Sequence, residues 1–284
     1  MKKAIQKADI LLEALPYIKK FQHKVMVIKC GGRQLMNKHI IDNILQDIVF
    51  MNCVGLNPVL IHGGGPSINQ TLQDLGKKIE FHQGFRVTDK HTLTVVVKEL
   101  NKLNQLMVKK IRQLGAKAEG LSGQKGKAIK AKKLHFDKNI GFVGEVAAIN
   151  TQGIKNLLKR GVVPVLTPLG IGRDNQIYNI NADMAAAEIA AQLGAWKLVL
   201  LTDVQGIMYS QRDKNSLIST LKIAEIKALI KKGIIHGGML PKVASCVKAL
   251  KNGVKKTHII DGGTPRSLLL EIFTNEGIGT QIVS

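Results

Sequence analysis

Short apolar runs alternate with segments of helical periodicity along most of this sequence, and the alternation limits the folds that it can form. Buried strands are predicted at VMVI (25–28), PVLI (58–61), VVPVL (162–166), WKLVLL (196–201) and THII (257–260). Helices are predicted at about 38–53, 66–76, 89–114, 152–160, 181–193, 222–232 and 239–252. This order is typical of βαβ units, so we expect an α/β fold, a three-layer αβα sandwich with a mostly parallel central sheet.

Two segments depart from the alternation. Residues 117–149 carry glycines and alternating residues, as in KGKAIKAKK and GFVGEVAAI, which indicate hairpins appended to the first half. Residues 167–175, TPLGIGRDN, have the turn residues and the polar shift of a boundary between two lobes. We therefore expect an N-terminal helix over 1–22, one lobe over 23–170 and a second lobe over 171–284.

The charge of the chain is strongly positive, with 42 Lys and Arg against 20 Asp and Glu, a formal +22. Such a field attracts polyanions, so nucleic acid has to be considered as a partner. However, only 4% of residues are aromatic and no nucleic-acid-binding motif occurs, so nucleic acid binding is not favoured. Two interpretations stay open: a solvated lysine surface, or an attraction for polyanions that include nucleotide phosphates.

Cysteine spacing and the N-terminus bear on the compartment. Cys30, Cys53 and Cys246 lie far apart without CxxC spacing, which argues against a disulfide framework and a zinc cluster. The first 22 residues contain two acidic residues and no serine, unlike a secretory or transit peptide. The longest apolar stretch, 184–201, is interrupted by polar and charged residues and is not expected to span a bilayer. We expect a soluble protein in a reducing compartment.

Two clusters of glycines directly follow predicted strands. Gly31 and Gly32 come after the first strand, and residues 63–65 come after the second. Ligands of open parallel sheets bind outside the carboxyl ends of the strands, where bare amides and helix N-termini suit phosphate oxygens. The spacing fits neither GxxxxGK[ST] nor GxGxxG. Tight turns without a ligand are the alternative, but two clusters on successive strands favour phosphate binding.

Four charged side chains are candidates for the same crevice. Lys29 precedes the first glycine pair, and Lys242 lies in GGMLPK before a predicted helix. Each lysine either extends to solvent or is directed at a shared anion. Asp183 either caps a helix or holds both lysines. Arg86 in GFRVT is either a surface residue or a bidentate partner for a carboxylate.

Six motifs in this order, IKCGG, HGGG, GFRVT, NINAD, LLTDVQGI and GGMLPK, resemble those of the amino acid kinase family over nearly the whole chain. GFRVT together with NINAD resembles its acetylglutamate kinase branch more than aspartokinase, glutamate 5-kinase, carbamate kinase or uridylate kinase. The resemblance implies that ATP phosphorylates the side-chain carboxylate of N-acetyl-L-glutamate in arginine biosynthesis. A catalytically silent amino-acid or nucleotide sensor of the same fold, or a kinase of a related amino acid, is the alternative.

The resemblance also implies roles for single residues. Lys29 and Lys242 would stabilise the transferring phosphoryl group from its two sides, and Asp183 would orient both lysines. ATP would arrive with Mg²⁺ held mainly by its phosphates, since no dedicated carboxylate cluster stands out. In the two-lobe scheme, the first lobe would bind the amino acid and the second would bind ATP.

The same resemblance implies two sets of binding residues. The substrate would be bound by Gly64, Gly65, Arg86, which would hold the α-carboxylate, and Asn179, which would bond the acylated amino acid. The nucleotide would be bound by Gly31, Gly32, Thr202, Asp203, Gly206, Ile207, Gly237, Gly238 and Met239.

The two ends of the chain resemble those of the arginine-inhibited members of this branch. The N-terminal helix would interlace dimers into a hexamer, a trimer of dimers, although a docked or frayed terminal helix is the alternative. Arginine would bind at Tyr17, His258, Glu271 and Gly277. Photosynthetic members are also controlled by the PII signalling protein. The chloroplast stroma, for a plastid-encoded chain, is favoured over a bacterial cytoplasm.

Overall fold

A computed structural model contains the expected central sheet. It describes residues 1–173, 175–210, 212–213, 215–274 and 277–284, and for residues 2–4, 6–8, 10 and 11 it describes the backbone alone. The sheet has eight strands, and six of them run parallel while the pair β12 and β14 runs in the opposite direction. Across the sheet the order is β12 (Thr220–Lys222), β14 (Thr280–Val283), β13 (Lys256–Asp261), β11 (Lys197–Thr202), β1 (Val25–Cys30), β2 (Asn57–His62), β8 (Val162–Leu166) and β5 (Lys117–Leu121).

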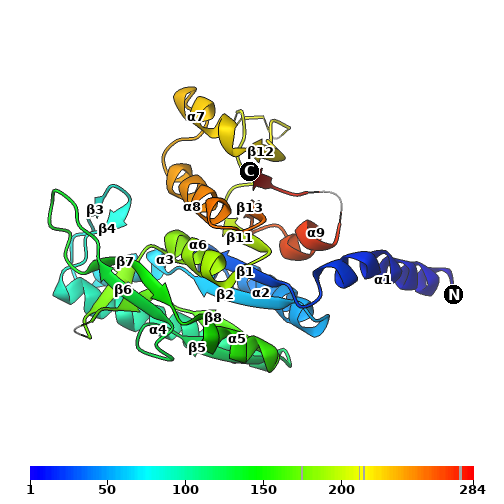
Figure 1. Cartoon of the computed structure of the whole chain (residues 1–284), viewed down its shortest axis with the longest axis horizontal. Coiled ribbons are helices and arrows are strands. Elements are labelled where there is room, and N and C mark those ends of the chain that lie inside the picture. Colours follow the sequence, from blue (N-terminus) through cyan, green and yellow to red (C-terminus); the bar gives the residue numbers. More distant parts are fainter. Residues whose placement is uncertain (174, 211, 214, 275–276) are drawn as a thin grey trace.

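Helices cover both faces of this sheet, as the sequence predicts (Figure 1). In β1 the side chains alternate between two buried clusters, because successive residues of a strand point to opposite faces: Val27 belongs to one cluster, Met26 and Ile28 to the other. The first cluster contains α5 (Thr151–Lys159), α6 (Ala182–Leu193) and α8 (Met239–Lys251), and the second contains α2 (Lys38–Cys53), α4 (Lys90–Gln113) and α9 (Ser267–Phe273). The three-layer αβα prediction is confirmed.

A small closed barrel lies beside the sheet and is made of β6 (Ile129–Lys133), β7 (Val143–Ile149), β9 (Leu169–Ile171) and β10 (Ile177–Ile180). The antiparallel pair β6 and β7 confirms the expected hairpin. β5 is different: it pairs in parallel with β8 at the edge of the main sheet. Its glycine weakened the strand signal, and that glycine is sterically required because a Cβ on Gly120 would lie 2.0 Å from Oδ1 of Asn104. The division into lobes at residue 171 stays a prediction.

The remaining elements are shorter or lie at the ends. They are η1 (Gln34–Met36), α3 (Gly65–Asp74), the hairpin β3 (Phe81–His82) and β4 (Phe85–Arg86), and α7 (Ile223–Lys231). The sequence prediction omitted α9, β12 and β14, which have only seven, three and four residues. Elements this short give too few residues for a periodic pattern to be recognised.

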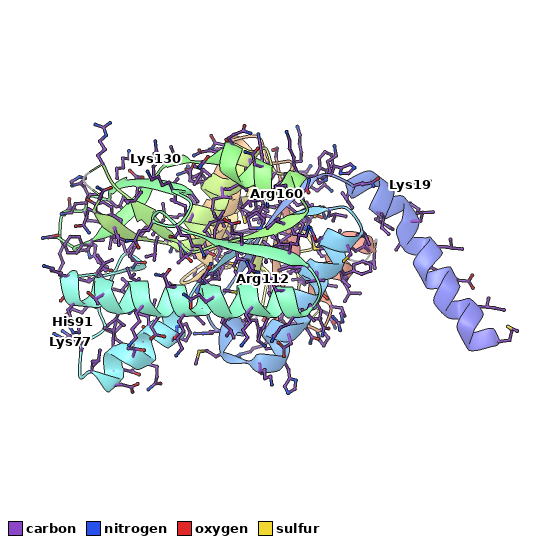
Figure 2. All side chains as sticks on the ribbon, turned by 90° about the horizontal axis from the view of Figure 1, so that it is seen from below. Lys19, Lys77, His91, Arg112, Lys130 and Arg160 are labelled. Carbon is purple, nitrogen blue, oxygen red and sulfur yellow. The ribbon has the colours of Figure 1, made fainter. Side chains whose placement is uncertain are left out.

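The N-terminal segment forms the expected helix, α1 (Lys2–Phe21), which extends away from the rest of the molecule (Figures 1 and 2). Its exposed apolar side chains include Ile5 at 54%, Leu12 at 65% and Leu15 at 42%. Within the part of the chain that the structure describes, none of the helices combines the length and apolar character needed to cross a bilayer. Figure 2 also shows labelled basic residues such as Lys19, Lys130 and Arg160 on widely separated elements.

Candidate active site

A cleft of about 1280 Å³ opens at the carboxyl ends of the parallel strands. The turns after β1, β2, β11 and β13 and the first residues of α6 and α8 form its walls. The structure gathers here every residue predicted for catalysis, substrate or nucleotide. They are Lys29, Gly31, Gly32, Gly64, Gly65, Arg86, Asn179, Asp183, Thr202, Asp203, Gly206, Ile207, Gly237, Gly238, Met239 and Lys242. Their individual roles stay predictions.

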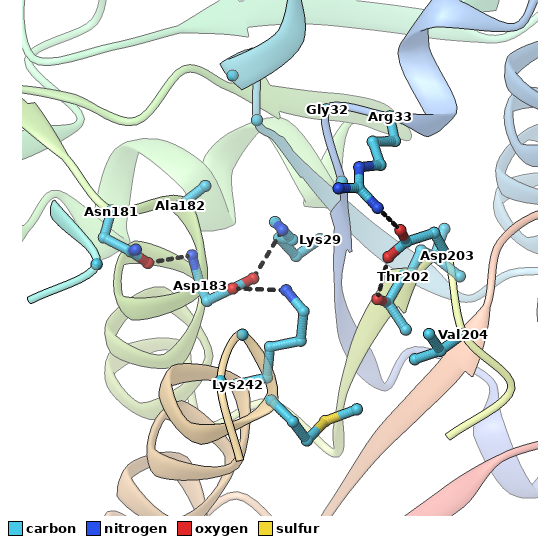
Figure 3. Close-up of a pocket in the computed structure, with 18 of the residues that line it drawn as sticks. Lys29, Gly32, Arg33, Asn181, Ala182, Asp183, Thr202, Asp203, Val204 and Lys242 are labelled. Carbon is cyan, nitrogen blue, oxygen red and sulfur yellow. Dashed lines mark hydrogen bonds and ion pairs between the residues drawn. The ribbon is translucent and has the colours of Figure 1, made fainter. Parts of the chain in front are cut away.

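Asp183 bridges two lysines that come from different elements (Figure 3). Its Oδ1 lies 2.8 Å from Nζ of Lys29 on β1, and its Oδ2 lies 3.1 Å from Nζ of Lys242 on α8. Burial would raise the pKa of Asp183, but the two ammonium groups hold it below its usual range. The carboxylate is therefore ionised at neutral pH and fixes both amines in the cleft.

The beginning of α6 explains why Asp183 is available for this role. Asn181 caps the helix, because its Oδ1 accepts hydrogen bonds from the backbone N–H groups of Asp183 at 2.9 Å and Met184 at 3.1 Å. The capping role considered for Asp183 thus belongs to Asn181, a residue that the sequence reasoning missed. NINAD contains the signal, since Asn is a preferred residue immediately before a helix.

The two glycine turns lie against each other, and this contact requires that side chains be absent. A Cβ on Gly32 would lie 2.6 Å from Cδ of Pro66 and 2.9 Å from N of Gly65. A Cβ on Gly64 would lie 2.6 Å from Cδ2 of Leu100 on α4. Backbone amides from both turns are therefore collected at one place in the cleft, next to the N-terminus of α3, as binding of phosphate oxygens requires.

Arg86 is buried in the cleft wall, with 8% of its surface exposed, so the surface interpretation is wrong. Its Nη2 donates to Oδ1 of Asn69 and, at 3.4 Å, to the carbonyl oxygen of Gly65, and its guanidinium lies 4.9 Å from the ring centroid of Phe81. Its Nη1 is buried and has no hydrogen-bond partner among the described residues. A buried donor without a partner indicates a missing acceptor, for which the carboxylate of a ligand is suited.

Asn179 on β10 faces the same part of the cleft. Its Nδ2 donates to Oγ1 of Thr88 at 3.2 Å, which fixes the orientation of the amide and leaves its oxygen as an acceptor. Asn69 is a second amide at this end of the cleft, and the sequence reasoning missed it because it lies within α3 without a motif around it.

A further cation, Arg33, also lines the cleft. Arg33 directly follows the first glycine pair, and its Nη1 is paired with Oδ2 of Asp203 at the end of β11 (Figure 3). The Arg33 side chain is 77% exposed and that of Asp203 is 42% exposed, so this pair contributes little to stability. The sequence reasoning did not consider Arg33, although its position next to Gly32 was visible.

The carboxylates that line the cleft already have partners. Asp183 holds two lysines, Asp203 pairs with Arg33, and Asp261 accepts from N of Gly263 at 2.8 Å and from a threonine hydroxyl at 3.1 Å. Among the described residues, no group of three His, Cys, Asp or Glu side chains is arranged to hold a metal ion. This donor set fits a metal ion that is bound mainly by phosphate oxygens of a nucleotide, and does not fit a separate protein site.

The predicted arginine-site residues lie outside this cleft. Nδ1 of His258 on β13 lies 2.7 Å from Oε1 of Glu271 on α9, and a Cβ on Gly277 would lie 3.9 Å from Oε2 of the same glutamate. Tyr17 is half-buried on α1 and packs against the cluster that contains α9. The sequence reasoning missed Lys197, whose Nζ lies 3.9 Å from Oε1 of Glu271. The structure thus brings three of the four predicted residues together.

Burial changes the pKa values in this second cluster. It lowers the pKa of Lys197 to about 8 and also lowers the pKa of His258, in part against the attraction of the neighbouring glutamate. Burial opposes ionisation of Glu271 as well, but His258 and Lys197 hold its pKa below the usual range. The cluster therefore contains a buried, ionised carboxylate between two basic groups that are not fully charged at slightly alkaline pH.

Comparison with known proteins gives consistent results. Residues 24–261 match the model of the amino acid kinase family. The acetylglutamate kinase of Heliobacterium modesticaldum is 50% identical over 294 residues, covering 100% of both chains. The acetylglutamate kinase of Syntrophomonas wolfei is 50% identical over 282 residues, covering 99% of this chain and 98% of that protein.

Solved structures are similar as well. N-acetylglutamate synthase of Neisseria gonorrhoeae, complexed with coenzyme A and N-acetyl-glutamate, has a TM-score of 0.87 at 26% identity, and the match covers 98% of this chain but 63% of the synthase. Carbamate kinase from Giardia lamblia bound to AMP-PNP has a TM-score of 0.68 at 19% identity, covering 92% of this chain and 99% of that chain, a similarity of fold alone.

Proposed function

The chain belongs to the amino acid kinase family, and from this premise we propose that it transfers the γ-phosphoryl group of ATP to the side-chain carboxylate of N-acetyl-L-glutamate. The products are N-acetyl-L-glutamyl 5-phosphate and ADP, in arginine biosynthesis. The observation that carries the proposal is the pair of ammonium groups that Asp183 holds beside the two glycine turns. The identity of about half to acetylglutamate kinases over the full length supports the choice of acceptor.

The chemistry of the reaction explains why cations and amides dominate the cleft. The acceptor is a carboxylate with an ordinary pKa of about 4.3, already ionised at neutral pH, so no general base is needed. The obstacle is electrostatic, because two anions must approach in line. An ammonium group about 4 Å from a unit negative charge contributes on the order of 4 kcal/mol at an effective dielectric constant near 20. Lys29 and Lys242 supply two such groups, and the amides of the glycine turns accept the remaining phosphate charge.

Magnesium bound to the nucleotide phosphates would supply further neutralisation of charge. The chain's own contribution is to bind and orient. Arg33 lines the cleft directly after the first glycine pair, and the N-termini of α3 and α8 are at the cleft. These positive ends attract anions without adding a titratable group.

Selection of the acceptor depends on Arg86 and Asn179. The unpartnered Nη1 of Arg86 is available to an α-carboxylate, and the amide of Asn179 to the acylated nitrogen or its carbonyl. A free amino group, as in glutamate or aspartate, would instead bring a positive charge close to a buried guanidinium. We therefore expect the N-acylated amino acid to be preferred.

A direct assay tests the proposed function. ATP consumption by the purified chain is measured with N-acetylglutamate, glutamate, aspartate and UMP as acceptors. We expect turnover with N-acetylglutamate and little with the others. Preference for another acceptor would support a kinase of a related amino acid. Absence of turnover, with intact ATP binding, would support the catalytically silent sensor.

Inhibition by arginine is the second part of the proposal. The buried Glu271 carboxylate offers an anionic partner for a guanidinium, and the related synthase, at 26% identity, has been solved with coenzyme A and L-arginine. Activity is titrated with arginine in the wild type, in Glu271→Ala and in a chain lacking residues 1–20. Unchanged inhibition in both variants would reject this site.

Assembly and compartment complete the proposal. The exposed apolar side chains of α1 suit a contact between dimers in a hexamer, a trimer of dimers. Control by the PII signalling protein and residence in the chloroplast stroma remain proposals that rest on resemblance and composition. The acetylglutamate kinases to which we compared the chain come from bacteria, which fits the alternative of a bacterial cytoplasm.

A further inference from the structure

His62 is a buried histidine that the reaction described above does not use. It is the last residue of β2, directly before the glycines of the second turn, and 0% of its surface is exposed. It does not line the cleft, but the next three residues do. Burying an imidazole requires partners for both ring nitrogens, so its contacts are informative.

The contacts determine which nitrogen carries the proton. Nδ1 lies 2.9 Å from the carbonyl oxygen of Gly63, and a carbonyl can only accept, so Nδ1 is the donor. Nε2 lies 3.4 Å from Nδ2 of Asn104 and 3.4 Å from Oγ1 of Thr167, both of which can donate to it. Asn104 is itself fixed by donation to the carbonyl oxygen of Val165 at 2.8 Å. Burial lowers the pKa of His62 to about 4, so the ring is neutral at physiological pH.

The bond to Gly63 also fixes the next amide. In a trans peptide unit the C=O and N–H bonds point in opposite directions, and the described residues contain no cis peptide. Since the oxygen of Gly63 points to the buried imidazole, the N–H of Gly64 in the same unit points away from it, and Gly64 itself lines the cleft. The preceding unit is fixed too, because N of Gly63 donates to the carbonyl oxygen of Cys30 at 2.9 Å.

The glycines themselves do not select the orientation of this peptide unit. Three consecutive glycines lack the side chains that restrict backbone rotation, so the orientation has to come from contacts and hydrogen bonds around the turn. A hydrogen-bond donor stabilises a transition state effectively only if it is already oriented. Reorienting it during the reaction would cost free energy and offset the stabilisation. We propose that His62 is a positioning residue, which holds the Gly64 amide directed at the phosphoryl group through its hydrogen bond to the Gly63 carbonyl. The role in catalysis rests on the proposed kinase function.

The ring nitrogens of the wild-type protein allow a first test that does not depend on activity. The protein is labelled with ¹⁵N-histidine, and the ring nitrogens of His62, identified by the signal lost in His62→Asn, are observed at pH 7. We expect a neutral ring protonated at Nδ1. Protonation at Nε2 alone would place a lone pair against the Gly63 oxygen and would overturn the proposal, whatever the protein's activity.

Two substitutions separate positioning from a structural role. The asparagine amide in His62→Asn can occupy the place of Nδ1, whereas the glutamine amide in His62→Gln reaches the place of Nε2. We expect kcat with ATP and N-acetylglutamate to stay close to wild type in His62→Asn. In His62→Gln we expect it to fall about a hundredfold, the usual effect of losing one positioned donor, with little change in KM for ATP.

Ile154→Ala on α5 controls for lost stability, because Ile154 is buried in the core and does not line the cleft. We expect it to lower the melting temperature without lowering kcat. Equal kcat in the asparagine and glutamine variants would overturn the proposal. If wild-type protein has no kinase activity, the proposed function fails, but the tautomer measurement still decides whether His62 orients the turn.

Discussion

Asp183 is the residue on which the proposed chemistry depends. Its carboxylate is buried and ionised, and it makes ion pairs of 2.8 and 3.1 Å with amines from β1 and α8. An isolated buried carboxylate would be unfavourable, so the two lysines and the aspartate stabilise each other in the absence of a ligand. When a phosphoryl group arrives, the amines are already in place.

Removing either amine should therefore affect turnover far more than folding. For Lys242→Ala and Lys29→Ala we expect kcat to fall by about a hundredfold or more, because one positioned donor to the transition state is lost. The control is Lys248→Ala, which removes a lysine of the same helix α8 whose Nζ lies 2.6 Å from Oε1 of Glu188 outside the cleft. Steady-state kinetics with circular dichroism checks this expectation. Turnover of Lys242→Ala near that of Lys248→Ala would remove Lys242 from the mechanism.

Lys197 gives an expectation for stability against pH. Its pKa is lowered from 10.5 to about 8 in the folded protein, so folding disfavours its charged form. Between pH 8 and 10.5 the unfolded chain binds this proton more tightly than the folded chain does, so the free energy of unfolding rises with pH in that window. We expect the unfolding free energy of the wild type to rise relative to that of Lys197→Met between these pH values. Urea denaturation at a series of pH values measures it, and a constant difference would contradict the assigned pKa.

At the scale of elements, the two strand-to-helix turns depend on close backbone contact. A Cβ on Gly32 or on Gly64 would lie 2.6 Å from a neighbouring atom, whereas a Cβ on Gly65 would have nothing within 4 Å. We expect Gly32→Ala and Gly64→Ala to lower the melting temperature, because the backbone or Leu100 must move. We expect Gly65→Ala to change the unfolding free energy by no more than about 0.5 kcal/mol. Similar melting temperatures for all three variants would show that the turns are not tightly packed.

Elements differ in how well the sequence predicts them. The parallel strands β1, β2, β8, β11 and β13 are long apolar runs, and their ends agree with the prediction within one or two residues. α9 has seven residues and β5 contains a glycine, so neither gives a periodic signal. The glycine turns of the cleft were predictable because both glycine clusters directly follow strands, whereas most other cleft residues were predicted from the resemblance to the family. Arg33, Asn69 and Lys197 were missed because their roles depend on contacts between distant segments, whereas the cap at Asn181 is local and its signal was present in NINAD.

At the scale of the whole molecule, contacts within the described chain do not explain the exposed apolar side chains of α1. Most of it extends from the body, and its exposed leucines and isoleucine have no partner within the described chain that accounts for their apolar character (Figure 1). Deletion of residues 1–20 leaves Phe21, which is buried in the core. We expect the full chain to form a hexamer and the deleted chain a dimer in size-exclusion chromatography with light scattering, with catalysis retained. Hexamers that persist in the deleted chain would contradict a role of α1 in assembly.

The central claim is that cations and amides converge on one phosphoryl group in a single cleft. A crystal structure with ADP, aluminium fluoride, Mg²⁺ and N-acetylglutamate tests it most directly, since the fluoride occupies the position of the transferring group. We expect the amines of Lys29 and Lys242 and the Gly64 amide within about 3 Å of the fluoride, and Arg86 on the α-carboxylate. A fluoride group bound without contact to either lysine would contradict the claim.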